Sequence, residues 1–350
     1  MQALDFPGGK VTYTPALRFI SESSEKRVPC YRVCDDNGDI ITGSDVVNRH
    51  GDPSNDGHNI LRSPEAGEDF LLRHFNRTEN LECCYGEVSQ SKSLPTNALE
   101  IRLTTGKGGK CHTQLPQAVG VAYSLKMDKK EACVVTYTGD GATSEGDFHA
   151  ALNFAAVMDA PVVFICRNNG WAISTHITEQ FRSDGIVVKG QGYGIRSIRV
   201  DGNDTLAVYG AISTAREMAI YEQRPILVEA LTYRVGHHST SDDSTKYRPV
   251  HEIEHWKMAR NPVNKFRNWV EKNGWWSDAG EYELRKNLKE ELLQAIQMAE
   301  RTEKHPLRDL FTDVYDLPPS NLCEQEKELR ESINKHPQDY PFDIPLYDKL

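Results

Sequence analysis

The sequence lacks the features that mark several classes of protein. It holds no apolar run close to the roughly 18 to 20 residues that a membrane-spanning helix needs. Its first residues, MQALDFPGGK, contain neither an apolar signal core nor an Arg-rich presequence, so no transit peptide is visible. The formal net charge is −10. A basic excess is therefore missing, which argues against a nucleic-acid-binding protein and a polybasic membrane-surface protein.

The eight cysteines form no CxxC pair and no spacing typical of a zinc site. We therefore expect unpaired thiols in a reducing compartment. Cys133 and Cys166 lie in the apolar runs CVVTYTG and VVFICRNN, where we expect them to be buried like small hydrophobic residues.

From about residue 113 onward, short β-branched runs alternate with stretches of helical periodicity. This alternation predicts an α/β fold, with a parallel sheet flanked by helices and a helical C-terminal region. The expected strands are ACVVTYTG, PVVFICRNN, IRSIRVDG and PILVEALTY, and the expected helices span residues 145–159 and 204–223.

Three divisions of the chain are expected: an N-terminal arm over 1–45, an irregular segment over 46–112, and a domain over 113–350 with a C-terminal helical extension. Within the helix at 145–159, Thr143 or Ser144 is expected to cap the N-terminus. The C-terminal extension shows an apolar stripe, which favours packing on its own domain or on a partner subunit. The stripe consists of Leu284, Leu288, Leu292 and Ile296.

An aspartate between two glycines, in GDGATSEG, is followed one helix and one strand later by the paired asparagines of CRNNGWAIS. Asp140 ends one expected strand and Asn169 the next, and the carboxyl ends of parallel strands face a common crevice. A carboxylate, a carboxamide and a backbone carbonyl near Trp171 are hard ligands that suit octahedral Mg²⁺. The helix that begins near Glu145 points its N–H groups at the same place. The pattern predicts a Mg²⁺ ion that joins the protein to a diphosphate.

This arrangement resembles the diphosphate-binding module of thiamine diphosphate enzymes, in which GDG and NN hold the metal. The strings TQLPQAVGVAYSLK, GDGATSEGDFHAALNFAAV, YGIRSIRVDGND and YRVGHHSTSDDS are similar to those of the alpha subunit of the branched-chain 2-oxo acid dehydrogenase, the decarboxylating first component of its complex. The resemblance covers residues 113 to about 345. The related pyruvate enzyme differs at GHHSTSDDS, so this string favours branched-chain substrates.

The resemblance implies ligands for two metal ions. Asp140 and Asn169 would bind Mg²⁺ through their side chains, and Trp171 would bind it through its carbonyl. Thr113 and Gln114 match family positions that hold a structural K⁺.

The resemblance also implies residues that line thiamine diphosphate. Gly139, Gly141 and Ala142 would lie beside the diphosphate together with Arg167. Taken alone, Arg167 could instead be a surface charge that follows a strand.

The string GHHSTSDDS carries a further pair of implied roles. His238 corresponds to a catalytic histidine beside the cofactor, and Ser239 corresponds to a regulatory phosphorylation site. Without the resemblance, the pair His237 and His238 would be a solvated loop or a fortuitous metal motif, and Ser239 would belong to a polar turn. A second family phosphorylation site falls on Pro249, so that control point is absent.

The implied activity is oxidative decarboxylation of branched-chain 2-oxo acids, with acyl transfer to a lipoyl group on the core of the complex. The implied location is the mitochondrial matrix. The implied partners are a beta subunit in an alpha2-beta2 heterotetramer, the lipoyl-bearing acyltransferase core, and a regulatory kinase and phosphatase. Two alternatives stay open: a catalytically impaired assembly or decoy subunit, and a first-component alpha subunit that acts on pyruvate or another 2-oxo acid.

The segment 46–112 does not fit the family. It shows no sustained helical or strand period, which predicts a disordered segment, yet it is long for a structureless insert in a compact domain. Family members carry QRQGRISFY, QYRE and DYGKGRQMP before TQLPQ, and this chain has none of them. Suitable codons for 103–112 encode DYGKGRQMP in another frame, and codons for 51–72 can likewise encode QRQGRISFY. We interpret residues 51–112 as partly an out-of-frame translation of that region.

Overall fold

The chain folds into two compact units, Met1–Trp276 and Ser277–Leu350. The computed structural model describes residues 3–6, 9–19, 28–44, 102–103, 113–312, 314–340 and 345. The predictions made for the segment 46–112 therefore lie outside the described residues, apart from residues 102 and 103.

Among the described residues, the first unit contains a sheet of eight strands in the order β1-β2-β3-β9-β10-β6-β5-β4. Every pairing is parallel except that of β1 with β2, so the predicted parallel α/β sheet is confirmed. The strands are β1 Ala3–Phe6, β2 Gly9–Thr14, β3 Cys30–Tyr31, β4 Arg102–Leu103, β5 Val134–Gly139, β6 Val162–Asn168, β9 Arg196–Asp201 and β10 Ile226–Leu231.

The four central strands, β5, β6, β9 and β10, lie where the alternating pattern predicted them. Two extensions of the sheet were not predicted from the sequence. The N-terminal residues supply β1, β2 and β3, and β3 pairs with β9. Residues 102 and 103 form β4, which pairs with β5.

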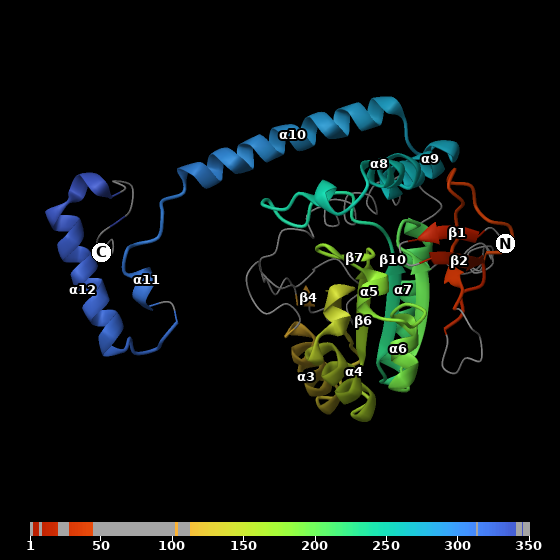
Figure 1. The fold of residues 1–350 in the computed structure, drawn as a ribbon, viewed down its shortest axis with the longest axis horizontal. Helices are drawn as coiled ribbons and strands as arrows, with labels where there is room; N and C mark the ends of the chain where they lie inside the picture. The colour runs from red at the N-terminus through yellow and green to blue at the C-terminus, as the bar shows by residue number, and fades with distance from the viewer. Residues whose placement is uncertain are drawn as a thin grey trace. The chain divides into compact units, whose positions relative to one another are not determined.

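Helices surround the strands of this unit (Figure 1). The two helices expected at 145–159 and 204–223 are present as α4 and α7. The helices are α3 Gln114–Met127, α4 Gly146–Val157, α5 Ile177–Gln180, α6 Val187–Gly192, α7 Thr205–Glu222, α8 Val250–Ala259 and α9 Pro262–Lys272. Shorter elements are the 3-10 helices η2 Gly141–Ser144 and η3 Ser244–Lys246 and the hairpin strands β7 Trp171–Ala172 and β8 Thr175–His176.

Two hydrophobic cores form because successive side chains of a strand point to opposite faces of the sheet. Val134 and Phe164 belong to the core that includes α3 and α4. Val135 and Ile165, one position along, belong to the core that includes α7 and α9. Full burial of each such side chain contributes about 1.5–3 kcal/mol. These cores hold the strand ends that carry the candidate site.

One face of α4 is buried as its periodicity predicted, and this packing orients the N-terminus of the helix toward the carboxyl ends of the strands. Phe148, Leu152 and Ala155 are each fully buried. Among the described cysteines no disulfide forms, and Cys133 and Cys166 are buried thiols, as expected.

The second unit is helical, in agreement with the expected C-terminal region. No side chain of α10 is buried, although Leu284, Leu288, Leu292 and Ile296 lie along it. In the parts of the chain described here, none of the helices combines the length and apolar character that a membrane span requires. The elements are α10 Asp278–Arg301, α11 Asp309–Thr312, α12 Ser320–Lys335 and the 3-10 helix η4 Pro337–Asp339.

Candidate functional site

Asp140 and Asn169 lie together at the carboxyl edge of the sheet. They follow the neighbouring strands β5 and β6, whose register pairs Gly139 with Arg167. The backbone N–H of Asn169 donates to Asp140 Oδ1 at 3.4 Å. The two residues singled out from the sequence are thus in direct contact.

Asp140 is almost completely buried, with 1% of its surface exposed. Gln180 Nε2, in α5, donates to its Oδ2 at 3.0 Å. Burial raises the pKa of Asp140 above its ordinary value, and the hydrogen bond from Gln180 opposes that rise. Among the described residues, no Lys or Arg side chain forms an ion pair with this carboxylate. The carboxylate is therefore buried without a direct ion pair in the described part of the chain, although the charge of Arg234 also lowers its pKa.

The turn after β6 presents two further oxygen atoms. Asn169 Oδ1 accepts from the backbone N–H of Trp171 at 3.0 Å. The Trp171 carbonyl accepts from Arg234 Nη1 at 3.0 Å, and a carbonyl oxygen has a second lone pair. Gly170 between them has φ +80°, a conformation that glycine adopts without strain.

These residues fit a hard divalent cation. A carboxylate, an amide oxygen and a backbone carbonyl are the ligand types that Mg²⁺ takes in proteins. Gln180 Oε1 is buried and has no hydrogen-bond partner among the described residues, so an oxygen atom next to Asp140 can accept a further interaction. Within the described residues no three His, Cys, Asp or Glu side chains gather as a metal cluster. A site with a single carboxylate is the kind that keeps open positions for phosphate oxygens and water.

The backbone turns sharply after Asp140 into the 3-10 helix η2. A side chain at Gly141 would place its Cβ 2.8 Å from the Cβ of Ala172, so only glycine fits there. Gly139 is exposed and Ala142 is buried. The three residues expected to line a diphosphate are thus consecutive with Asp140 at the strand edge.

The expected side-chain cap of α4 is wrong. The helix begins at Gly146, and its N-cap is Glu145, whose side chain makes no capping hydrogen bond. Thr143 instead lies inside η2, where its hydroxyl donates to the Asp140 carbonyl at 2.8 Å. Ser144 is exposed at the end of the same turn. The extra 3-10 turn separates Asp140 from α4 and uses the hydroxyl that local sequence would assign to a cap.

Lys189 of α6 supports this turn from the other side. Its Nζ donates to the Thr143 carbonyl at 2.8 Å and to Thr143 Oγ1 at 3.0 Å. The ammonium also lies 4.6 Å from the ring centroid of Phe181. Lys189 thus places a positive charge one turn from Asp140 and fixes the backbone of η2.

Arg167 is exposed at the end of β6, and its side chain has no hydrogen bond or ion pair among the described residues. It is placed to meet an anion at this edge. The same exposure fits the alternative of a surface charge, so its role stays a prediction.

The two residues expected to hold K⁺ lie at the start of α3. Thr113 is the half-buried N-cap. Gln114 is buried, and its Nε2 donates to the Tyr137 carbonyl at 3.2 Å. Gln114 Oε1 is also buried and has no hydrogen-bond partner in the part of the chain that the structure describes. A buried amide oxygen of this kind is suited to bind an alkali cation.

The loop that follows β10 is held together by its own side chains. His237 Nδ1 accepts from the Ser244 backbone N–H at 3.0 Å. Asp242 Oδ2 accepts from the His238 backbone N–H at 2.8 Å and from the Tyr247 hydroxyl at 2.7 Å. The two histidines do not form a metal site with described residues. The His238 ring is exposed and available to a ligand.

Ser239 lies in the same loop and is half-buried. Its Oγ is 3.2 Å from Ser241 Oγ. The side chain has no charged partner within the described part of the chain, so its hydroxyl is available for chemistry.

Sequence reasoning missed Gln180, Lys189 and Arg234. Each reaches the Asp140 region from a different element, and none belongs to a string that contains Asp140 or Asn169. Only their polar character in otherwise ordinary segments could have drawn attention to them.

Comparisons with known proteins agree with the motif. The family described as dehydrogenase E1 component matches residues 68–308, a range that reaches into the segment 46–112. The chain is 53% identical over 395 residues to 2-oxoisovalerate dehydrogenase subunit alpha 2, mitochondrial, of Arabidopsis thaliana, covering 99% of this chain and 84% of the relative. It is 55% identical over 390 residues to subunit alpha 1, mitochondrial, of the same plant, covering 97% and 83%.

A more distant relative extends the similarity beyond plants. The chain is 46% identical over 287 residues to 2-oxoisovalerate dehydrogenase subunit alpha, mitochondrial, of Dictyostelium discoideum, covering 80% of this chain and 65% of the relative. The alignments with the Arabidopsis thaliana proteins are longer than the 350 residues of this chain. Those relatives therefore carry residues that have no counterpart here.

Proposed function

The chain belongs to the dehydrogenase E1 component family, and from that membership we propose that it acts as the alpha subunit of a branched-chain 2-oxo acid dehydrogenase. The reaction is oxidative decarboxylation of a branched-chain 2-oxo acid, with transfer of the acyl group to a lipoyl group. The observation that carries this proposal is the identity of 53% over 99% of the chain to a 2-oxoisovalerate dehydrogenase alpha subunit. The location that follows from the same relatives is the mitochondrion.

Thiamine diphosphate is the cofactor of this family, and Mg²⁺ would join its diphosphate to the protein. When bound, the cofactor would supply a nucleophilic carbon for the 2-oxo carbon and a positively charged ring that accepts the electrons left when CO₂ departs. Asp140 would bind the metal through its carboxylate, Asn169 through its amide oxygen and Trp171 through its carbonyl. Arg167 and the backbone of Gly141 would meet the diphosphate. The buried carboxylate of Asp140, which has no ion pair among the described residues, supports this assignment.

Two further sites belong to the proposal. The orphaned Oε1 of Gln114 supports a structural K⁺ beside Thr113. The exposed ring of His238 is suited to contact the cofactor from the loop after β10, and Ser239 is suited to phosphorylation by a regulatory kinase, with reversal by a phosphatase.

The chain would work as half of an active site. The name "subunit alpha" of its relatives supports a beta subunit as partner in an alpha2-beta2 heterotetramer, and a lipoyl-bearing acyltransferase core would accept the acyl group. That beta subunit would supply the acidic group that helps to deprotonate the cofactor.

A second candidate function is an assembly subunit with impaired catalysis. It is favoured by the absence of QRQGRISFY, QYRE and DYGKGRQMP and by the residues of its relatives that have no counterpart here. The intact contact between Asp140 and Asn169 favours the first function.

The test is coexpression with the beta subunit of the same organism, followed by measurement of decarboxylation of branched-chain 2-oxo acids and of pyruvate. We expect thiamine diphosphate-dependent turnover of the branched-chain acids. Asp140→Asn should abolish it with an unchanged circular dichroism spectrum, because the amide removes the only anionic protein ligand in the proposed set. Asp147→Asn, in the exposed first turn of α4, is the matched control and should keep activity. Full activity in Asp140→Asn would refute the site, and a complex that assembles without turnover would establish the second candidate.

A further inference from the structure

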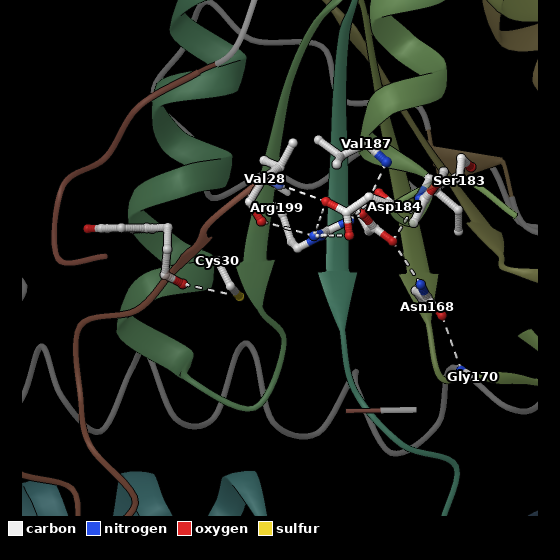
Figure 2. Close-up of polar contacts among 12 residues, drawn as sticks. Val28, Cys30, Asn168, Gly170, Ser183, Asp184, Val187 and Arg199 are labelled. Atoms are coloured by element: carbon white, nitrogen blue, oxygen red, sulfur yellow. Dashed lines mark hydrogen bonds and ion pairs between the residues drawn. The ribbon is translucent and has the colours of Figure 1, made fainter. Parts of the chain in front are cut away.

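A buried polar network lies directly behind the turn that carries Asn169. Its centre is Glu229 of β10, which is fully buried. The carboxylate accepts from Arg199 Nε at 2.9 Å, from Asn168 Nδ2 at 2.8 Å, and from the backbone N–H groups of Ile186 and Val187 at 3.0 Å each. Asn168 lies on β6 and Arg199 on β9, so the two side chains come from different strands (Figure 2).

Glu229 is held in its ionised form. Burial alone would raise its pKa, but the Arg199 guanidinium and the hydrogen bonds lower the pKa below its ordinary value. An ionised carboxylate only accepts hydrogen bonds, so the amide of Asn168 must turn its Nδ2 toward Glu229. The other end of that amide is then fixed: Asn168 Oδ1 accepts from the Gly170 backbone N–H at 3.1 Å (Figure 2).

The network is closely packed and extends to the N-terminal residues. A Cβ on Gly185 would lie 2.2 Å from Arg199 Nη2, which leaves no room for another side chain. Arg199 Nη1 donates to the Val28 carbonyl at 3.0 Å, and the Val28 N–H donates to Asp184 Oδ2 at 2.7 Å. Little freedom is left for the Glu229 carboxylate to move.

We propose that Glu229 is a positioning residue for the metal-binding turn. It orients the Asn168 amide, the amide fixes Gly170, and the turn then aims the Asn169 side chain and the Trp171 carbonyl at the ion beside Asp140. Glu229 and Asn168 do not touch the ion in this assignment. The inference rests on the proposed function, because it concerns the Mg²⁺ site of that function.

The test exchanges donor and acceptor within the pair. In Asn168→Asp two carboxylates face each other, and in Glu229→Gln the acceptor-only group is lost. In the double variant the new amide at position 229 can donate to the new carboxylate at position 168, while the N–H of Ile186, which shares Oε1 with Asn168, loses its acceptor. The other oxygen of that carboxylate still accepts from Gly170, and the negative charge near Arg199 is kept. Asn168→Ala removes both hydrogen bonds without adding a charge, in case the single carboxyl variant does not fold.

Each purified alpha-beta complex is titrated with Mg²⁺ at saturating thiamine diphosphate, and isothermal calorimetry measures the Mg²⁺ affinity. We expect each single variant to bind Mg²⁺ about tenfold to hundredfold more weakly, the cost usual for groups that orient metal ligands. The double variant should recover part of that loss, as expected for a directly coupled pair, and the remainder reflects the hydrogen bond that Ile186 no longer makes. Asp204→Asn is the control, because Asp204 is as buried as Glu229 and also accepts backbone hydrogen bonds. Its donors are the N–H groups of Val33, Cys34 and Ala207, none of which belongs to the turn at 168–171.

A second readout does not need the cofactor. Hydrogen exchange of the peptide that spans residues 168–172 should speed up in both single variants of the metal-free complex and return toward wild type in the double variant. If the folded single variants keep the Mg²⁺ affinity and the hydrogen-exchange rate of the wild type, the positioning role is wrong. It is also wrong if the single variants lose no more Mg²⁺ affinity than Asp204→Asn does. If the wild-type complex itself fails to bind Mg²⁺ and thiamine diphosphate, the proposed function fails, and the exchange experiment alone decides whether Glu229 orders the turn.

Discussion

The backbone N–H of Asn169 donates to the carboxylate of Asp140 at 3.4 Å, which joins the ends of two neighbouring parallel strands. This hydrogen bond holds the two residues close together at the carboxyl edge of the sheet. The arrangement buries a carboxylate with which no described Lys or Arg side chain forms an ion pair. The burial of this carboxylate and the contacts around it have consequences that can be measured.

The stability of the metal-free protein should depend on pH through Asp140. Burial raises the pKa of this carboxyl above its ordinary value of 3.8. Between the ordinary and the raised pKa the folded protein holds a proton that the unfolded chain has lost, so stability falls as pH rises through this window. Urea unfolding of wild type and of Asp140→Asn at a series of pH values checks this. The wild type should lose stability relative to the variant as pH rises, and saturating Mg²⁺ with thiamine diphosphate should reverse the difference at neutral pH. A difference that does not change with pH would contradict the prediction.

Potassium should stabilise the protein through Gln114. A ligand that binds only the folded state raises its stability by mass action. We expect a higher melting temperature in KCl than in NaCl of the same ionic strength. Each kcal/mol that K⁺ adds to the free energy of unfolding should raise the melting temperature by about 2–4 °C in a domain of this size. In Gln114→Leu, which removes the orphaned Oε1, the two salts should give equal melting temperatures. A KCl effect of the same size in Gln114→Leu would remove this residue from the ligand set.

Phosphorylation of Ser239 should inactivate the enzyme by loosening the loop after β10. A phosphate adds a charge of about −1.5 to −2 at neutral pH. It would lie beside Asp242, whose hydrogen bonds to the His238 backbone and to Tyr247 hold the loop. We expect Ser239→Glu to lower kcat by about tenfold, equivalent to about 1.4 kcal/mol in the barrier. Limited proteolysis should show faster cleavage within 234–248.

The neutral variant Ser239→Gln is the matched control for charge, and Thr240→Glu, at the exposed neighbouring position, is the control for location. Both should remain near wild type. A fully active Ser239→Glu enzyme with a protected loop would contradict the prediction.

The segment 46–112 should limit cofactor binding. The resemblance implies that the QYRE of family members, missing here, contacts the diphosphate, and a hydrogen bond to a charged group is worth about 1.5–3 kcal/mol. We expect a variant that carries QRQGRISFY, QYRE and DYGKGRQMP in this region to bind thiamine diphosphate about tenfold to hundredfold more tightly than the present chain, with a matching gain in turnover.

Equal affinity and turnover, with residues 46–112 protected from hydrogen exchange in the present chain, would show that this segment is a genuine alternative structure. Sequencing of the messenger across codons 46–112 tests the out-of-frame interpretation separately.

The sequence alone was sufficient for the central sheet and for the pairing of Asp140 with Asn169. Both depend on local chemistry. Buried parallel strands have short runs of β-branched residues in the sequence, and a glycine on each side of an aspartate permits the turn that ends a strand. Because parallel strands end at one edge, two strand-end residues can be placed together without knowledge of the rest of the fold.

The tertiary structure decided which other groups reach that pair. Gln180 on Asp140, Arg234 on the Trp171 carbonyl and Glu229 behind Asn168 are contacts between residues far apart in the chain. The hydroxyl of Thr143 has the chemistry of a helix cap but donates to the Asp140 carbonyl. Local pattern cannot select among such partners, because a buried polar group takes whichever partner the packing brings within hydrogen-bond distance.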